Sequence, residues 1–165
     1  MSTLSEAQIL PIAQRGAAIL AQQAQVVSDP FQLEIQTLIR DMQATMLAAN
    51  GVGIAAPQVF QSLRIIIVAS RPNPRYPEAP LMEPVVMINP EILWQSNETC
   101  LGEEGCLSVQ DTRAQVARAE RLRVRYLNQQ GETVEVEYDG FVARIIQHEV
   151  DHLNGVLFVE RAGLL

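Results

Sequence analysis

The sequence predicts a single α+β domain, residues 1–165, in which antiparallel β-sheets pack around a central C-terminal helix. Three features predict this class: helical spacing of apolar residues over 31–49, strand-like alternation over 121–138, and a second helical segment over 141–153. The order of helix, several strands and helix lacks the repeated strand–helix rhythm of a parallel sheet. A chain of 165 residues is long enough to bury one hydrophobic core.

Composition and charge narrow the classes of function. Apolar residues make up 48% of the chain and charged residues 19%, as in a soluble globular protein. The net charge of −7 makes a broad phosphate-binding face a poor hypothesis, so we expect no direct nucleic-acid binding. No apolar run reaches membrane-spanning length, and the polar start with Glu6 lacks the pattern of a signal peptide. We therefore expect a cytoplasmic protein without membrane contact.

The first predicted helix follows a polar lead, residues 1–28, which has the pattern of a further possible helix. Asp29-Pro30 is typical of a helix start, with Asp as the cap and Pro in the first position. Asn50-Gly51 is a typical terminator. Apolar residues between these signals recur at helical spacing and predict an amphipathic helix over 31–49: Phe31, Ile35, Leu38, Ile39, Met42 and Met46.

Short β-like runs follow this helix. The first two are residues 63–69 and 85–89, and the five prolines within 71–84 predict a surface loop between them. Residues 121–127 and 133–138 alternate around a turn and predict a β-hairpin. The arginines in this region are interpreted as one solvated strand face: Arg118, Arg121, Arg123 and Arg125.

The second helix, residues 141–153, carries the pattern H-E-x-x-H. His148 and His152 lie about 40° apart on one helix face, so both imidazoles can reach one metal ion. Glu149 lies about 100° round the helix from His148, a position that suits a general base acting on water at the metal. The alternative to a metal site is a buried helix that contains two histidines by chance. This alternative is weak, because the chain has no other histidine and these two bracket a glutamate at the required spacing.

A catalytic site of this type needs three protein ligands and an open position. With no third histidine and only Glu160 as an acid after His152, the remaining candidates are Cys106, Cys100 or an upstream acid. Gly105 allows a close backbone approach beside Cys106, and a thiolate ligand favours Fe(II), Co(II), Ni(II) or Zn(II) over Mg(II). A small buried hydrophobe is the alternative role for Cys106 and the expected role of Cys100. The two cysteines could also pair, although reduced thiols or metal ligation fit a cytoplasmic protein better.

The pair Gly51-x-Gly53 is not a dinucleotide-binding loop, because the third glycine is missing and the segment follows a helix. We expect a loop that lies close to a ligand, with Gln58 as an amide donor able to stabilise an oxyanion. A packed turn with Gln58 in solvent is the alternative.

Taken together, three ordered segments resemble the peptide deformylase family, and the similarity extends over residues 9–159. The segments are Gly-Val-Gly-Ile-Ala-Ala-Pro-Gln at 51–58, Glu-Gly-Cys-Leu-Ser at 104–108, and Gln-His-Glu-Val-Asp-His-Leu-Asn-Gly at 147–155. The resemblance implies hydrolytic removal of the N-formyl group from nascent polypeptides that begin with formyl-methionine. It also implies that Cys106, His148 and His152 bind the metal, with Fe(II) favoured and Zn(II), Ni(II) or Co(II) as alternatives. Glu149 would then act first as the base and afterwards as the acid.

The resemblance extends to the substrate site. Gln58 and the backbone N–H of Leu107 would hold the formyl oxygen, and Gly53 would hydrogen-bond the substrate backbone. The extended peptide could pair with a strand edge near Gly53. Glu104 matches the acid that the family carries beside the site, where it could pair with an arginine, Arg118 or Arg144. The expected apolar pocket for the methionine side chain comprises Val52, Phe141 and Ile145.

Two departures from the family pattern affect the periphery of the site. Residues 109–113 lack the proline that many members carry, which affects the expected substrate rim. Only Arg161 is basic in the last ten residues, so we expect no more than transient contact with the ribosome. An H-E-x-x-H metallopeptidase that cleaves internal bonds, and a non-enzymatic metal-binding protein, are the competing functions.

Overall fold

The computed structural model describes residues 6–163, so the ends of the predicted domain, 1–5 and 164–165, lie outside the described residues. Five strands form one antiparallel sheet in the order β1-β2-β3-β6-β7, and β4 and β5 form a separate two-stranded sheet. The predicted α+β class, with antiparallel sheets and a C-terminal helix, is confirmed. The described elements are a 3-10 turn η1 (Ala18–Ala21), α1 (Leu33–Ala48), β1 (Gly53–Ala55), a 3-10 turn η2 (Ala56–Val59), β2 (Ile65–Val68), β3 (Val85–Gln95), β4 (Thr99–Cys106), β5 (Val109–Ala119), β6 (Arg121–Leu127), β7 (Thr133–Asp139), α2 (Gly140–Leu153) and α3 (Phe158–Arg161).

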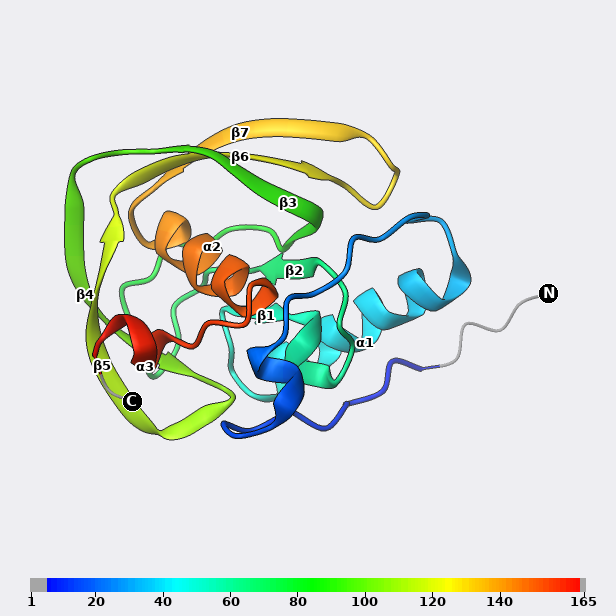
Figure 1. Cartoon of the computed structure of the whole chain (residues 1–165), viewed down its shortest axis with the longest axis horizontal. Coiled ribbons are helices and arrows are strands. Elements are labelled where there is room, and N and C mark those ends of the chain that lie inside the picture. Colours follow the sequence, from blue (N-terminus) through cyan, green and yellow to red (C-terminus); the bar gives the residue numbers. More distant parts are fainter. Residues whose placement is uncertain (1–5, 164–165) are drawn as a thin grey trace.

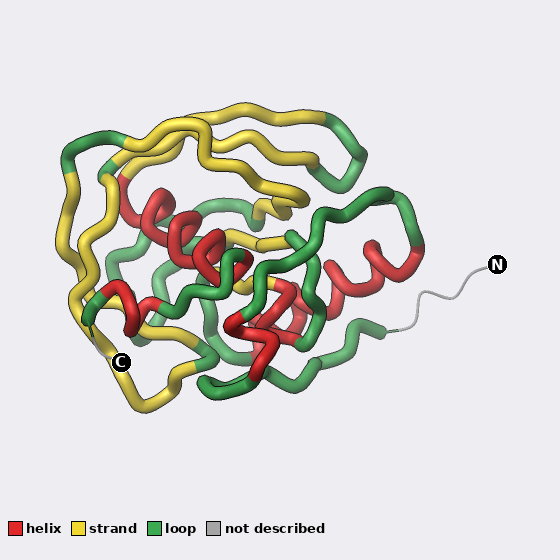
Figure 2. The backbone as a smooth tube through the Cα atoms, viewed as in Figure 1, coloured by secondary structure: helices red, strands yellow, loops and turns green. Residues whose placement is uncertain are grey.

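Helix α2 lies in the middle of the molecule (Figures 1 and 2), with the five-stranded sheet on one side and the β4–β5 hairpin on another. From Ala143 to Leu153 every residue of α2 is buried. Its apolar side chains pack with those of β2, β3 and β6 in one core cluster. Polar residues on a helix with no exposed face must find partners inside the protein, because an unpaired buried polar group is costly. Helix α2 therefore places its histidines and acids in the interior.

Helix α1 begins later than the sequence predicted. Asp29 forms a turn ahead of the helix, with its Oδ1 accepting a hydrogen bond from Phe31 N at 2.9 Å. Phe31 is 64% exposed and does not belong to the buried face. The helix ends at Ala48, just before the expected terminator, where Asn50 adopts the left-handed conformation (φ 56°) and Gly51 N donates to Met46 O at 2.9 Å. Its buried side chains pack with β2 and the β1–η2 segment, and so fix the start of the glycine loop.

The strands differ from the prediction mainly between residues 90 and 119. The predicted hairpin is present as β6 and β7. The long β4–β5 hairpin was not predicted, because glycines and adjacent acids at 102–105 interrupt the alternation of β4. Residues 6–27 contain only the short turn η1 in place of a possible helix.

Two further single-residue predictions are wrong. Arg118 was placed on a solvated strand face, but its side chain is 5% exposed. Cys100 was expected to be a small buried residue, but it is a free thiol exposed on β4, and Cys106 is likewise unpaired.

Among the described residues, the structure contains no helix both long and apolar enough to cross a membrane.

Candidate active site

The three predicted metal ligands come together from two elements that are distant in sequence. His148 and His152 lie one turn apart on α2 with ring centroids 5.2 Å apart, and Cys106 is the last residue of β4. The Cys106 Sγ is 3.3 Å from His152 Nε2, and the candidate ligand atoms of the three residues all lie within 4.8 Å of one another. All three side chains are buried. The geometry fits a single ion bound by one thiolate and two imidazoles.

The tautomer of His148 is set by Glu104. The Nδ1 of His148 is 2.9 Å from Glu104 Oε1, which leaves Nε2 as the nitrogen available to an ion. Burial alone would raise the pKa of Cys106, but the neighbouring His152 and His148 bring it well below its ordinary value, which favours the thiolate. A thiolate and two neutral imidazoles suit Fe(II), Co(II), Ni(II) or Zn(II). The residues present therefore fit the metal that the sequence predicted.

Glu104 is fully engaged by protein groups. Arg118 donates to both of its oxygens at 2.9 Å each, and Arg144 Nη1 donates to Oε2 at 2.7 Å. Burial raises the pKa of this carboxyl, but the hydrogen bonds from Arg118 and His148 outweigh that effect and hold the pKa below its usual range. Both arginines suggested as partners are thus in contact with Glu104. The geometry makes Glu104 a support for His148, whereas the sequence analysis had grouped it with substrate-binding residues.

Asp151 extends this network and was missed by the sequence analysis. Arg118 Nη1 donates to Asp151 Oδ2 at 2.7 Å, and Arg161 donates to both Asp151 oxygens at 3.0 and 2.9 Å. The spacing of Asp151 on α2 could have indicated burial, because it lies beside His148 and His152 in the same helix. The network connects α3, α2 and the β4–β5 hairpin behind the two histidines.

Glu149 lines the same pocket as two of the candidate ligands, Cys106 and His148. Its side chain is 4% exposed, and its Oε1 has no hydrogen-bond partner among the described residues. Burial raises the pKa of Glu149, while His148 and His152 oppose that shift. Gly53 lies directly against it: a Cβ at this position would be 2.7 Å from Glu149 Oε2 and 2.7 Å from Ile145 Cγ2. A buried carboxylate with a free oxygen is suited to accept a proton from a reactant.

Gln58 is buried in η2, contrary to the alternative that placed it in solvent. Its Oε1 accepts from Ala55 N at 3.0 Å, which directs Nε2 towards Ser108 Oγ at 3.1 Å and Cys106 Sγ at 3.5 Å. Leu107 occupies the turn between β4 and β5, immediately after Cys106. Gln58 and Leu107 both line one pocket with Cys106.

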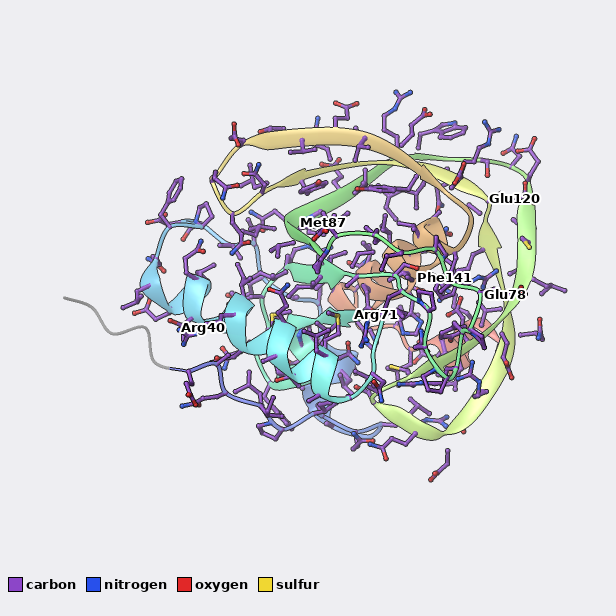
Figure 3. The ribbon with its side chains drawn as sticks, turned by 180° about the vertical axis from the view of Figure 1, so that it is seen from behind. Arg40, Arg71, Glu78, Met87, Glu120 and Phe141 are labelled. Carbon is purple, nitrogen blue, oxygen red and sulfur yellow. The ribbon has the colours of Figure 1, made fainter. Side chains whose placement is uncertain are left out.

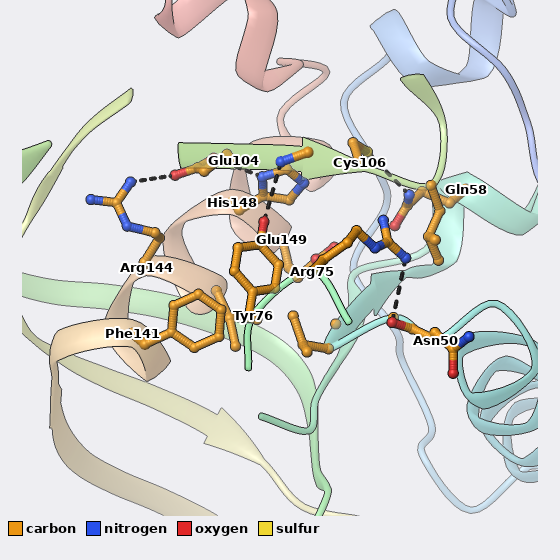
Figure 4. Close-up of a pocket in the computed structure, with 16 residues that line it drawn as sticks. Asn50, Gln58, Arg75, Tyr76, Glu104, Cys106, Phe141, Arg144, His148 and Glu149 are labelled. Atoms are coloured by element: carbon orange, nitrogen blue, oxygen red, sulfur yellow. Dashed lines mark hydrogen bonds and ion pairs between the residues drawn. The ribbon is translucent and has the colours of Figure 1, made fainter. Parts of the chain in front are cut away.

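That pocket contains the predicted substrate residues (Figure 4). Val52, Gly53, Phe141 and Ile145 line it together with His148 and Glu149. His152 is not among the lining residues, because it lies deeper, at 1% exposed. The predicted apolar wall and the predicted polar groups therefore share one concave site, the usual setting of an enzyme active site.

Residues from the proline-rich loop 71–84 also line the pocket, and the sequence analysis missed them. Tyr76 packs against Phe141 with ring centroids 4.8 Å apart, and Tyr76 Oη accepts from Gly105 N at 3.3 Å. Arg75 Nη2 donates to the backbone oxygen of Asn50 at 3.3 Å, and both residues line the pocket (Figure 4). Figure 3 shows Phe141 beside the loop. Proline spacing predicted a surface loop but could not show that the loop folds back over the pocket.

A buried Cys-His-His cluster with an adjacent unpartnered glutamate, on a helix in an α+β fold, defines the class of H-E-x-x-H metallohydrolases. The sequence matches the family profile described as Polypeptide deformylase over residues 9–164. It is 53% identical over 154 residues to peptide deformylase 2 of a Nostoc species, covering 93% of this chain and 86% of that protein. It is 52% identical over 155 residues to peptide deformylase 2 of Shewanella oneidensis, covering 94% and 85%. The chain belongs to the peptide deformylase family and is an enzyme of that family.

Solved structures agree with the sequence comparisons. The fold is similar to that of a Met-Ala-Ser-bound class I type b peptide deformylase from Acinetobacter baumannii, with a TM-score of 0.91 and 62% sequence identity over 93% of this chain and 98% of that chain. It is also similar to peptide deformylase from Thermotoga maritima, with a TM-score of 0.83 and 39% identity over 93% and 97%.

Proposed function

We propose that this protein is a metal-dependent hydrolase that removes the N-formyl group from the formyl-methionine of nascent polypeptides and releases formate. The observation that carries the proposal is the position of Glu149, whose unpartnered Oε1 lies beside the Cys106, His148 and His152 cluster in a pocket with an apolar wall. A purely structural metal site would not need such a carboxylate. The A. baumannii relative bound to Met-Ala-Ser supports a peptide that begins with methionine as the ligand class.

Cys106, His148 and His152 would hold the metal, with Fe(II) favoured and Zn(II), Ni(II) or Co(II) as alternatives. When bound, the ion would supply Lewis acidity that polarises the formyl group and lowers the pKa of water. Glu104 fixes the Nδ1 of His148 by its hydrogen bond at 2.9 Å, so the ring presents Nε2 to the ion. Arg118 keeps Glu104 in place and charged.

The chain's own residues would then perform the proton transfers. Glu149 takes a proton from the attacking water as the oxygen bonds to the formyl carbon. Gln58 Nε2 and the backbone N–H of Leu107 donate to the oxygen on which negative charge develops, an effect worth about 3–4 kcal/mol for each donor in comparable sites. Glu149 returns the proton to the leaving nitrogen as the C–N bond breaks. One water is consumed, and formate and a free amino terminus are produced.

Substrate placement follows from the pocket lining. Val52, Phe141 and Ile145 would surround the methionine side chain, because they form the apolar part of the wall. Gly53 lies in β1, an edge strand that pairs with β2 and with no other strand of the described residues, so its backbone can pair with an extended peptide. Such pairing would direct the formyl group towards Glu149. We further propose that the enzyme acts in the cytoplasm and meets the ribosome only transiently.

A comparison of two substrates tests this function. Protein purified without oxygen and loaded with Fe(II), Ni(II) or Co(II) should release formate from a formyl-Met peptide and leave the peptide bonds of an unformylated peptide intact. Cys106→Ala should lose both bound metal and formate release. Cleavage of internal bonds together with tolerance of Cys106→Ala would favour the metallopeptidase alternative and reject the proposal.

A further inference from the structure

An N-terminal segment contacts both chain segments that carry the proposed oxyanion donors. Ala13 N donates to Gln58 O at 2.6 Å, and Arg15 N donates to Ser108 O at 2.8 Å. Between them, the side-chain amide of Gln14 donates to Leu107 O at 3.2 Å. We call residues 12–15 the N-terminal strap. These few residues thus join η2 to the β4–β5 turn, two segments about fifty positions apart in the chain.

We propose that the N-terminal strap is a positioning element that fixes the spacing between Gln58 Nε2 and the Leu107 N–H. The inference rests on the proposed function, in which both groups donate to the same substrate oxygen. Catalysis by such donors depends on preorganisation, since they must be in place before charge develops. Gln58 and Leu107 belong to separate turns, so their relative position depends on what connects those turns.

The side-chain hydrogen bond between η2 and the β4–β5 turn is made by Gln58 Nε2, which is also a proposed oxyanion donor. Gln58 Nε2 donates to Ser108 Oγ at 3.1 Å, and the same amide has to reach the substrate oxygen during the reaction. The strap bonds use backbone carbonyls of Gln58, Leu107 and Ser108, which take no part in the chemistry. They can therefore persist through the catalytic cycle and hold the turns while the Gln58 amide changes partner.

The N-terminal strap is itself anchored. Ala13 is fully buried and belongs to the same apolar cluster as Cys106 and Val109. On the other side, Leu10 N donates to Thr45 Oγ1 of α1 at 2.8 Å. A positioning role requires an element that is fixed independently of the groups it positions, and the bond to Thr45 of α1 satisfies that requirement.

Local geometry supplies a variant that removes one strap bond, and a matched control accounts for the loss of its side chain. Ala17 N donates to Gln14 O at 3.0 Å, and Gly16 has a φ of 102°, so residues 14–17 form a turn with Arg15 in its second position. A positive φ at the third position is typical of a type II turn, which favours proline at the second. Arg15→Pro therefore suits the turn and deletes the N–H that bonds to Ser108 O. Arg15→Ala removes the same side chain and keeps the N–H, so it is the matched control.

The experiment compares formate release by metal-loaded Arg15→Pro and Arg15→Ala, together with amide hydrogen exchange over residues 105–109. Displacing a donor should cost less than the 10²- to 10³-fold loss typical of removing one, so we expect kcat to fall about tenfold with KM nearly unchanged. Arg15→Ala should keep wild-type kcat. Exchange over 105–109 should become faster in Arg15→Pro alone, and metal content should be equal in both variants.

Several outcomes would overturn the inference. An equal kcat for the two variants, or a loss in Arg15→Pro that falls on KM or on bound metal, would show that the strap does not position the donors. If Arg15→Pro does not fold, Gln14→Ala makes the same test through the bond to Leu107 O, with a smaller expected fall in kcat and the same requirement for unchanged KM. Absence of formate release by the wild-type enzyme would instead reject the proposed function, while the exchange measurement would still report on the strap.

Discussion

Replacing Gly53 by alanine should disable the enzyme through steric contact with its proposed base. The added Cβ would lie 2.7 Å from Glu149 Oε2, whereas ordinary contacts begin at 3.4 Å, so the shortfall is about 0.7 Å. It would also lie 2.7 Å from Ile145 Cγ2, which blocks displacement of the loop towards α2. The carboxylate must therefore move by most of an ångström. A displacement of that size at a reacting group costs on the order of 10²-fold in rate, so we expect kcat to fall by about that factor.

The assay is formate release from a formyl-Met peptide, with bound metal and thermal midpoint measured on the same preparation. Gly51→Ala is the matched control from the same loop, because the atoms nearest to its Cβ would be Leu107 Cδ1 at 3.1 Å and Met46 Cγ at 3.3 Å rather than those of Glu149. It should lose less than about tenfold in kcat. A Gly53→Ala enzyme with normal metal content and kcat within threefold of wild type would refute the assigned position and role of Glu149.

Three further predictions concern catalysis, stability and pH. Glu149→Gln preserves side-chain volume but not the proton acceptor, so kcat should fall by about 10²- to 10⁴-fold while bound metal, measured by elemental analysis, is unchanged. Arg118→Ala leaves the buried carboxylates of Glu104 and Asp151 without their shared partner, so the free energy of unfolding, measured in urea, should fall by about 3–5 kcal/mol. Arg123→Ala is the control, because it removes an exposed ion pair and should change that free energy by less than about 1 kcal/mol. Burial, together with Tyr138, raises the pKa of Tyr126 to about 12 from 10. The neutral phenol is therefore favoured in the folded state, so this contribution to the free energy of unfolding is complete below pH 10 and is lost as pH rises towards 12. Tyr126→Phe should remove that part of the pH dependence of the free energy of unfolding. An unchanged alkaline profile in this variant would count against the assignment.

The sequence predicted best those features that depend on local periodicity. Residues at i and i+4 on a helix share a face, so the proximity of His148 and His152 followed from the motif and helix geometry alone. The β6–β7 hairpin was also predictable, because both strands alternate around a turn. Local periodicity did not predict the position of Cys106. This residue lies beside α2 because of the β4–β5 hairpin, which local alternation did not reveal. Its assignment as a ligand came from the family resemblance rather than from spacing.

Other features depend on long-range packing that no local pattern contains. Arg118 belongs to the same Arg-rich stretch as the exposed Arg123, yet its side chain is buried between Glu104 and Asp151, which compensate its charge. Tyr76 lies in a proline-rich stretch that predicted only a loop, and its packing on Phe141 joins segments 65 positions apart in sequence. Two of the three bonds made by the N-terminal strap are donated by backbone N–H groups, which any residue other than proline can supply, so no pattern of side chains in the sequence indicates them.

In the proposed reaction, the buried Cys-His-His centre and Glu149 hydrolyse a terminal formyl amide. The most direct test follows one formyl-Met peptide with the Fe(II)-loaded enzyme, and measures formate and the mass of the peptide product in the same reaction. We expect one formate for each peptide consumed and a peptide product that has lost only its formyl group. Glu149→Gln should produce neither formate nor the deformylated peptide. Peptide fragments without formate, or formate production that persists in Glu149→Gln, would contradict it.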